Sequence, residues 1–329
     1  MSSRSRLHCP SGGRLSTLLA ILALPAFALT SSVEAQLYFS DDFNDGNDTS
    51  PAWTRYDPIG SHPQIPDQAV WTFPNGGYRM QTPPSPSPAT VGPGRAGSLR
   101  PEVYTDFYIA VDIVNWDDTK DQAIGILARC TQIGLGQTDG YSMTYQVPDH
   151  DIDITRFVNE NTSTAAGGRS IPLDAEDAVT LVPGHSYRFT FSGHGTTLTA
   201  RVYELPDTVN PIMSGSGTDD MFPSGQCGLI VFDNSGGTNV TDATFDNYYA
   251  TDIEPPKLTM QNLFFEFYRL SWPLDKPQFI LERSTVLPGT ATDWQTVTAV
   301  SQDPNNGIFF HDIDTTLDGP LNFYRLVRR

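Results

Sequence analysis

Short runs of Val, Ile, Tyr, Phe and Thr, cut every few residues by Gly, Pro, Asn or Asp, recur along most of this chain. Within these runs the apolar residues alternate, as in 107–114, where every second side chain is Phe, Ile, Val or Ile. This period of two is the period of a β-strand, and amphipathic helix patterns are nearly absent. Many short strands with regular turn signals predict an all-β, antiparallel two-sheet sandwich or jelly roll.

Several of these runs pair into predicted hairpins. Residues 187–191 and 198–203 alternate on either side of Ser-Gly-His-Gly, whose glycines suit the positive φ angles of a tight turn. A second hairpin is predicted for 141–147 and 151–158. Two late strands are expected at 228–233 and 243–249, and a long proline-rich loop is expected at 82–97.

The first 35 residues have the composition of an export signal. Three arginines precede an apolar run at 15–29, and the tripeptide Val-Glu-Ala at 33–35 suits a signal peptidase. Cleavage is therefore predicted after Ala35, which makes the chain secreted and extracellular. An uncleaved anchor is the alternative, although the run is short for a membrane span, and no later segment is apolar enough to be one.

The formal net charge of −18 bears on the choice of partner. An acidic surface repels phosphate backbones, so nucleic acid is not expected as a partner. Beyond the export signal the chain has two cysteines, Cys130 and Cys227, both in strand-like runs. Export would permit a disulfide between them, and two buried free thiols are the other reading.

A proline-containing linker at 253–256 divides the chain after the export signal at 1–35. We expect a large β domain at 36–252 and a small one at 257–329. The small domain is predicted to be a β-sandwich of the immunoglobulin or fibronectin type. Its expected strands are 263–272, 278–283, 294–300, 307–312 and 322–327.

The order of five segments in the large domain suggests a family. These are DDFNDG at 41–46, Trp71 followed by GGYRM at 76–80, AIGILAR at 123–129, the hairpin at 187–203, and the closing strands between 228 and 248. With this order, residues 37–252 resemble the concanavalin A-like lectin/glucanase superfamily, in its laminin-G-like (LamG-like) jelly-roll branch. The resemblance implies that glycans bind on the concave sheet or its loop rim.

The tail has its own resemblance. Ser271-Trp272-Pro273, the segment LERS at 281–284 and the segment FYRL at 323–326 are similar to a fibronectin-III-like unit found at the ends of secreted bacterial proteins. Neither resemblance decides the function, because such folds serve lectins, glycanases, adhesion modules and structural spacers.

Glycan binding needs aromatic faces together with side chains that hydrogen-bond hydroxyl groups. Trp116 lies in a polar turn, Arg129 ends a strand with core-facing neighbours, and Tyr145, Asp153 and Arg156 lie on the neighbouring predicted hairpin. These five are the candidate carbohydrate-binding residues. Asp153 and Arg156 are an odd number of residues apart, so alternation does not place both on one face. The alternative is an ordinary solvated sheet face with a half-buried tryptophan.

Calcium is the one cofactor considered. Asp41, Asp42 and Asp45 crowd the first strand, and Asp246 lies on the last one, which in the resembled superfamily commonly pairs near the first. Carboxylate oxygens from both ends would suit Ca²⁺, and a solvated turn is the alternative. The scattered histidines do not predict zinc.

The predicted function is a secreted carbohydrate-binding or adhesion-type protein with a glycan as its partner. The alternatives are a glycoside-processing enzyme, glucanase-like or keto-glycoside hydrolase-like, and a structural surface spacer. Against the retaining glucanase pattern, Asp151 and Asp153 match in part, but the acid/base position falls on Thr155 or Arg156. Retaining hydrolysis needs two carboxyl groups, so no catalytic residue is assigned. A distant carboxylate, Glu102 or Glu160, is the exception left open.

Overall fold

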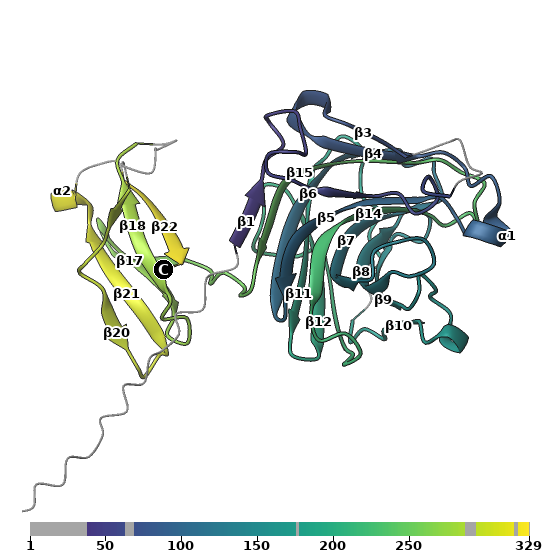
Figure 1. Cartoon of the computed structure of the whole chain (residues 1–329). Coiled ribbons are helices and arrows are strands. Elements are labelled where there is room, and N and C mark those ends of the chain that lie inside the picture. The colour runs from purple at the N-terminus through teal and green to yellow at the C-terminus, as the bar shows by residue number, and fades with distance from the viewer. Residues whose placement is uncertain (1–37, 63–68, 176–177, 287–293, 319–321, 329) are drawn as a thin grey trace, which may run out of the picture. The chain divides into compact units, whose positions relative to one another are not determined.

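Residues 38–251 form two antiparallel sheets that enclose a common core (Figure 1). The structure, a computed structural model, describes residues 38–62, 69–175, 178–286, 294–318 and 322–328. The eight-stranded sheet has the order β13-β12-β11-β6-β15-β4-β3, and β1 pairs with β15. Its strands are β1 (Tyr38–Asp41), β3 (Val70–Thr72), β4 (Tyr78–Thr82), β6 (Phe107–Trp116), β11 (Tyr187–His194), β12 (Thr197–Glu204), β13 (Met213–Thr218) and β15 (Thr241–Thr251).

The second sheet has seven strands in the order β10-β9-β8-β7-β14-β5-β2. Its strands are β2 (Thr54–Tyr56), β5 (Arg95–Tyr104), β7 (Gln122–Thr131), β8 (Asp139–Gln146), β9 (Asp151–Phe157), β10 (Arg169–Ser170) and β14 (Gly225–Asp233). All pairings in both sheets are antiparallel, which confirms the predicted all-β, two-sheet sandwich.

Alternation along the strands builds the core. On β6, Phe107, Ile109, Val111 and Ile113 are all at most 2% exposed, as their spacing predicts. The inward residues of the seven-stranded sheet, such as Ile126 on β7, belong to the same cluster. Each strand of this sheet therefore has its alternate residues on an outer face, which is where the site described below is built.

The two ends of the large sandwich meet on one strand. β15 pairs with β1, β4 and β6, and Asp41 of β1 lies opposite Tyr248 of β15. The resemblance implied that the last strand lies beside the first, and the register shows that it does.

The expected loop at 82–97 is shorter than predicted. β4 ends at Thr82, the single-turn helix α1 (Pro88–Val91) interrupts the prolines, and β5 begins at Arg95. Two further single turns are the 3-10 helices η1 (Pro74–Gly76) and η2 (Thr164–Ala166).

Residues 259–328 form two more antiparallel sheets, with the orders β16-β17-β21-β20 and β19-β18-β22. Leu270, Trp272, Leu281 and Ile313 make their core. The expected strand at 263–272 was wrong as one element, because a turn at residues 265–266 divides it. The elements are β16 (Thr259–Phe264), β17 (Phe267–Pro273), β18 (Phe279–Ser284), β19 (Gln295–Thr296), β20 (Ser301–Asp303), β21 (Ile308–Asp314), α2 (Thr315–Asp318) and β22 (Phe323–Arg328).

The fibronectin type of these sheets and the domain boundaries at 36–252, 253–256 and 257–329 remain predictions. The predicted signal peptide, 1–35, lies outside the described residues. Within the described part of the chain, none of the helices has the length and apolarity to span a bilayer.

Cys130 and Cys227 are both buried free thiols. Cys227 packs in the core between the sheets, whereas Cys130 belongs to a separate cluster with Leu99 and Leu127. The structure thus has the second of the two arrangements left open by the sequence. Burial raises the pKa of both thiols, which keeps them protonated.

Candidate functional site

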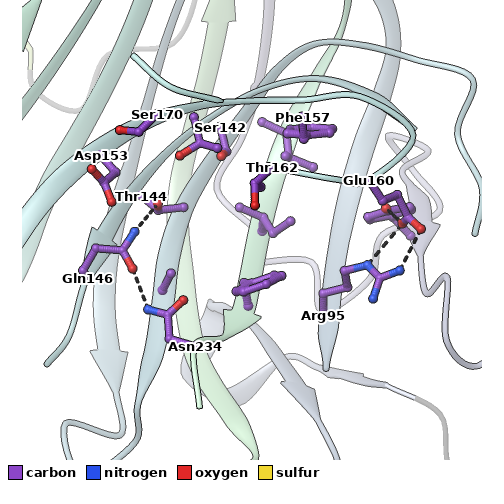
Figure 2. Close-up of a pocket in the computed structure, with 16 residues that line it drawn as sticks. Arg95, Ser142, Thr144, Gln146, Asp153, Phe157, Glu160, Thr162, Ser170 and Asn234 are labelled. Carbon is purple, nitrogen blue, oxygen red and sulfur yellow. Dashed lines mark hydrogen bonds and ion pairs between the residues drawn. The ribbon is translucent and has the colours of Figure 1, made fainter. Parts of the chain in front are cut away.

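A pocket of about 360 Å³ lies on the outer face of the seven-stranded sheet (Figure 2). Strands β7, β8, β9 and β14 form its floor, and the segment after β9 supplies part of its wall. Its volume is at the lower end of the range of small-molecule sites. The described residues that line it are Tyr56, Arg95, Ala123, Leu127, Ser142, Thr144, Gln146, Asp153, Thr155, Phe157, Glu160, Thr162, Ser170, Ile230, Phe232 and Asn234.

Strand alternation sets the chemistry of the floor. On β8, Met143 and Tyr145 face the core, so Ser142, Thr144 and Gln146 face the pocket. On β9, Asp153, Thr155 and Phe157 face the pocket in the same way, because Ile152 and Ile154 are in the core. Two neighbouring strands therefore present a patch of hydroxyl, amide and carboxylate groups.

Two glycines leave positions on this outer face without a projecting side chain. Gly125 lies between Thr144 on one side and Ile230 on the other in the sheet register. A Cβ on Gly125 would lie 1.9 Å from the carbonyl oxygen of Met143, so no side chain fits there. Gly97 on β5 is similar, with a Cβ placed 2.5 Å from the carbonyl oxygen of Leu229. The backbone itself forms part of the face at these two positions.

A directed chain of hydrogen bonds crosses the polar side of the pocket. Nδ2 of Asn234 donates to Oε1 of Gln146 at 2.5 Å, and Nε2 of Gln146 donates to Oγ1 of Thr144 at 2.8 Å (Figure 2). Thr144 lies opposite Asp153 across the β8–β9 pair. These bonds fix the orientation of the two amides, so the groups that a ligand meets are held in place.

The opposite end of the pocket is closed by a buried ion pair. Nη2 of Arg95 lies 2.7 Å from Oε2 of Glu160, and Nη1 of Arg95 donates to the carbonyl oxygens of Val91 and Pro93. Glu160 also accepts hydrogen bonds from the Tyr56 hydroxyl and from the backbone N–H of Gly136. The segment after β9 is thereby tied to β5, β2 and the β7–β8 connection.

Burial and pairing act in opposite directions on Arg95. Burial alone would lower the pKa of its guanidinium, but the hydrogen bonds and charge of Glu160 outweigh burial and raise that pKa. The pKa of Tyr56 is raised by burial and further by the neighbouring Glu160 charge. Both groups therefore keep their protons, and Arg95 and Glu160 form a fixed, neutralised pair.

Of the five candidate carbohydrate-binding residues, Asp153 lines this pocket. Trp116 does not, and the expectation of a partly exposed indole is corrected, because the side chain is 6% exposed in the core. Its ring meets Tyr187 edge to face at 5.8 Å. Tyr145 is 2% exposed, and its hydroxyl donates to the Val179 carbonyl oxygen. Neither ring has a face open to a sugar.

The two arginines are also placed elsewhere. The strand pattern breaks at Arg129, which has a φ of 49° next to a β-bulge, and its 1% exposed side chain donates to three backbone carbonyl oxygens. Arg156 pairs with Asp219 at 2.7 Å and donates to the Gly167 carbonyl oxygen. The odd spacing noted in the sequence fits this outcome, because Arg156 is absent from the lining that includes Asp153.

Sequence reasoning missed most of the lining. Thr144, Gln146 and Asn234 carried no signal as single polar residues, although the alternation of β8 could have placed the first two on the outer face. Glu160 was considered only as a distant carboxylate. Its pairing with Arg95 spans 65 residues, which no local pattern reports.

The four predicted calcium ligands are near one another at the joined chain ends. Asp41, Asp42 and Asp45 line a hollow with Asn247, and the charges of Asp41 and Asp42 act on Asp246. The pKa of Asp41 and that of Asp246 are raised, chiefly by burial. Asp41 already accepts hydrogen bonds from Phe43 N–H and Trp53 Nε1. Among the residues described, no group of three or more carboxylate, His or Cys side chains has the geometry of a metal site, and calcium remains a prediction.

Neither a family model nor a curated protein matches the sequence. Solved structures do match. The carbohydrate-binding module CBM66 from Bacillus subtilis has a TM-score of 0.42 and 17% identity, covering 60% of this chain and 94% of that one. A Bacillus subtilis protein of unknown function with a galectin-like fold has a TM-score of 0.45 and 9% identity, covering 66% and 96%.

Lectin II from Ulex europaeus gives a TM-score of 0.42 and 11% identity, covering 65% of this chain and 97% of that one. A β-1,3-1,4-glucanase from a mouse hindgut metagenome gives 0.42 and 13%, covering 65% and 98%. These four structures are a carbohydrate-binding module, a protein of unknown function, a lectin and a glucanase. Lectins and glucanases are the kinds of protein that the resemblance of the large domain names. At such identities and TM-scores, function has to be argued from the pocket itself.

Proposed function

We propose that this chain is a secreted carbohydrate-binding protein that holds one or a few sugar units in the pocket of the seven-stranded sheet. The observation that carries the proposal is the juxtaposition of two surfaces in this pocket. Polar groups of Asn234, Gln146 and Thr144, which are held by hydrogen bonds to one another, and the Asp153 carboxylate lie beside apolar side chains.

A sugar ring has the matching chemistry. Its hydroxyl groups donate and accept hydrogen bonds, as the carboxylate, amide and hydroxyl groups of the polar side require. Its C–H faces pack on apolar surface, which Phe157, Phe232 and Ile230 provide. Because the amides are already oriented by their mutual hydrogen bonds, little order has to be imposed when a ligand binds.

Binding without cleavage fits the carboxylates of the pocket. Asp153 and Glu160 are the two carboxylates among the described lining residues, and they lie at opposite sides of it (Figure 2). Glu160 is already held by Arg95, Tyr56 and Gly136. A general acid must be able to give its proton to a leaving group, and a carboxylate paired in this way is poorly placed to do so.

The proposal is tested by screening the purified chain on a glycan array and then measuring the affinity for each hit by calorimetry. Gln146→Ala and Asn234→Ala should each weaken binding by about tenfold, the effect of losing one or two neutral hydrogen bonds. Ser142→Tyr should abolish it by filling the floor. Gln302→Ala, on the exposed strand β20 of the other pair of sheets, is the matched control.

Three outcomes contradict the proposal. Undiminished affinity in all three pocket variants would place the glycan elsewhere. A chain that binds no glycan would favour the structural spacer. New reducing ends on incubation with a bound polymer, lost in Asp153→Asn, would instead make it a glycoside-processing enzyme.

A further inference from the structure

Arg95 and Glu160 of the pocket are paired with each other, and this has a consequence for the class of sugar that fits. We infer that the pocket selects neutral sugars through a hydroxyl group donated to Asp153, and discriminates against uronic acids and sulfated sugars. The inference rests on the proposed carbohydrate-binding function and adds to it the substrate class.

The first argument is the charge of the lining. Among the described residues that line the pocket, Asp153 and Glu160 are acidic and Arg95 is the single cation, which gives a formal charge of −1. The whole chain adds to this field with its formal charge of −18. A ligand carboxylate or sulfate would therefore enter a region of like charge.

The second argument is that four of the five N–H donors of Arg95 are already bonded within the protein. Its guanidinium pairs with Glu160 through Nε at 3.2 Å and Nη2 at 2.7 Å, and Nη1 donates to two backbone carbonyl oxygens at 2.9 Å. The side chain is 8% exposed. Recognising an anion at Arg95 would require breaking this buried pair, which would leave Glu160 buried without its cation.

The third argument concerns which ligand groups the Asp153 carboxylate of the lining can meet favourably. An ionised carboxylate only accepts hydrogen bonds, so a ligand group that meets it must bring a proton. A sugar hydroxyl does so, whereas a carboxylate or sulfate does not. The charge-assisted O–H···O⁻ bond is also stronger than a bond between neutral groups. At one position, Asp153 therefore binds a sugar hydroxyl favourably and repels an anionic group.

The amide chain agrees with this assignment. Asn234 donates to Gln146, which donates to Thr144, and Thr144 lies opposite Asp153 in the register. The neutral polar groups next to Asp153 thus offer both donors and acceptors. A hydroxyl-rich neutral ring can use both kinds at once.

The test compares matched neutral and charged probes on the purified chain. The neutral probes are dextran, galactan, xylan, β-glucan and fructan oligosaccharides. The charged ones are dextran sulfate, oligogalacturonate and glucuronoxylan oligosaccharides of the same lengths. Affinities are measured at low and at physiological salt, in the wild type, Asp153→Asn and the control Asp118→Asn, whose side chain is exposed in the β6–β7 turn.

The expected result is binding of at least one neutral probe, with the charged counterpart weaker by on the order of tenfold or more. Asp153→Asn should lower the affinity for the neutral probe and reduce the difference in affinity between the neutral and charged probes, because it removes both the acceptor charge and the repulsion. Asp118→Asn should change neither the affinity nor the difference. Equal or tighter binding of a charged probe, or an unchanged difference in Asp153→Asn, overturns the inference and leaves the carbohydrate-binding function standing. Failure of every probe, neutral and charged, overturns the proposed function itself.

Discussion

The guanidinium of Arg95 and the carboxylate of Glu160 meet at 2.7 Å although 65 residues separate them, and both side chains are less than 10% exposed. Arg95 opens strand β5, and Glu160 lies in the segment after β9. The pair therefore joins strand β5 to the segment that follows β9, at one end of the pocket.

Replacing Glu160 by Gln should destabilise the protein by roughly 3–5 kcal/mol, because it leaves the Arg95 charge buried without a counter-ion. The double variant Arg95→Met, Glu160→Gln should recover part of this loss. Denaturant unfolding monitored by tryptophan fluorescence gives the free energies. Lys120→Ala, which breaks the partly exposed Lys120–Asp117 pair, should cost less than about 1 kcal/mol. A Glu160→Gln variant as stable as that control would show that the pair contributes little.

Adding a methyl group at Gly125 should distort the pocket floor. The new Cβ would lie 1.9 Å from the Met143 carbonyl oxygen, so β7 and β8 must move apart. We expect Gly125→Ala to cost about 1–3 kcal/mol of unfolding free energy and to weaken glycan binding. At Gly134 the nearest atom would be 3.9 Å away, so Gly134→Ala is the control. Equal stability of the two variants would contradict the close approach of these strands.

The pKa of Asp219 gives a pH prediction. Burial alone would raise this pKa, but hydrogen bonds from Tyr141, Met221 and Arg156 outweigh burial and lower it below 3.8. A carboxyl whose folded pKa is depressed stabilises the fold above its unfolded pKa and loses that contribution as the pH falls through the folded value. The stability difference between wild type and Asp219→Asn should therefore be constant from about pH 5 to 8 and shrink below about pH 4.

Unfolding measured in urea at each pH checks this, with Asp118→Asn as the exposed control. A difference that grows towards acid pH would show that the pKa of Asp219 is raised in the folded protein.

Calcium, as predicted from Asp41, Asp42, Asp45 and Asp246, should raise the melting temperature if it binds the folded state. Binding at a hundred times Kd stabilises by about 2.7 kcal/mol. Melting curves are recorded with EDTA, with calcium and with magnesium. Asp45→Asn together with Asp246→Asn should remove the calcium response. A melting temperature unchanged by calcium and by chelator would remove the predicted site.

Limited proteolysis tests the predicted boundary at 253–256. Cleavage there should leave a resistant fragment that ends near residue 252 and unfolds at an unchanged temperature, because the two pairs of sheets have separate cores. Mass spectrometry identifies the cut and calorimetry its effect. Collapse of the fragment after cleavage would argue for a single cooperative unit.

Strands with clear alternation could be predicted from sequence, and strands of small residues could not. The runs that became β6 and β11 alternate apolar side chains, and their inward faces are as expected. β13 reads Met-Ser-Gly-Ser-Gly-Thr, and β5 contains glycine and proline, so neither carries a hydrophobic period. β13 is a strand because it pairs with β12, and β5 because it pairs with β14 and β2. The residue pattern within β13 or β5 does not contain these contacts.

The same division applies to the site. The outward position of Asp153 follows from the alternation of Ile152 and Ile154 around it. The prediction for Trp116 was wrong because its polar sequence neighbours suggested exposure. The indole is instead buried by packing on Tyr187. The closed end of the pocket depends on a contact between Arg95 and Glu160, which only the folded chain brings together.

The central position of β15 has a consequence for how the chain reaches its fold. This strand is the last of the large sandwich in sequence, yet it lies between β6 and β4 and also holds β1. The eight-stranded sheet therefore cannot close until residues 241–251 have left the ribosome, and its first strand has no partner until then. Pairings of such long sequence separation carry a high loop-closure cost and give slow folding, so this sheet stays open until late in the synthesis of the chain.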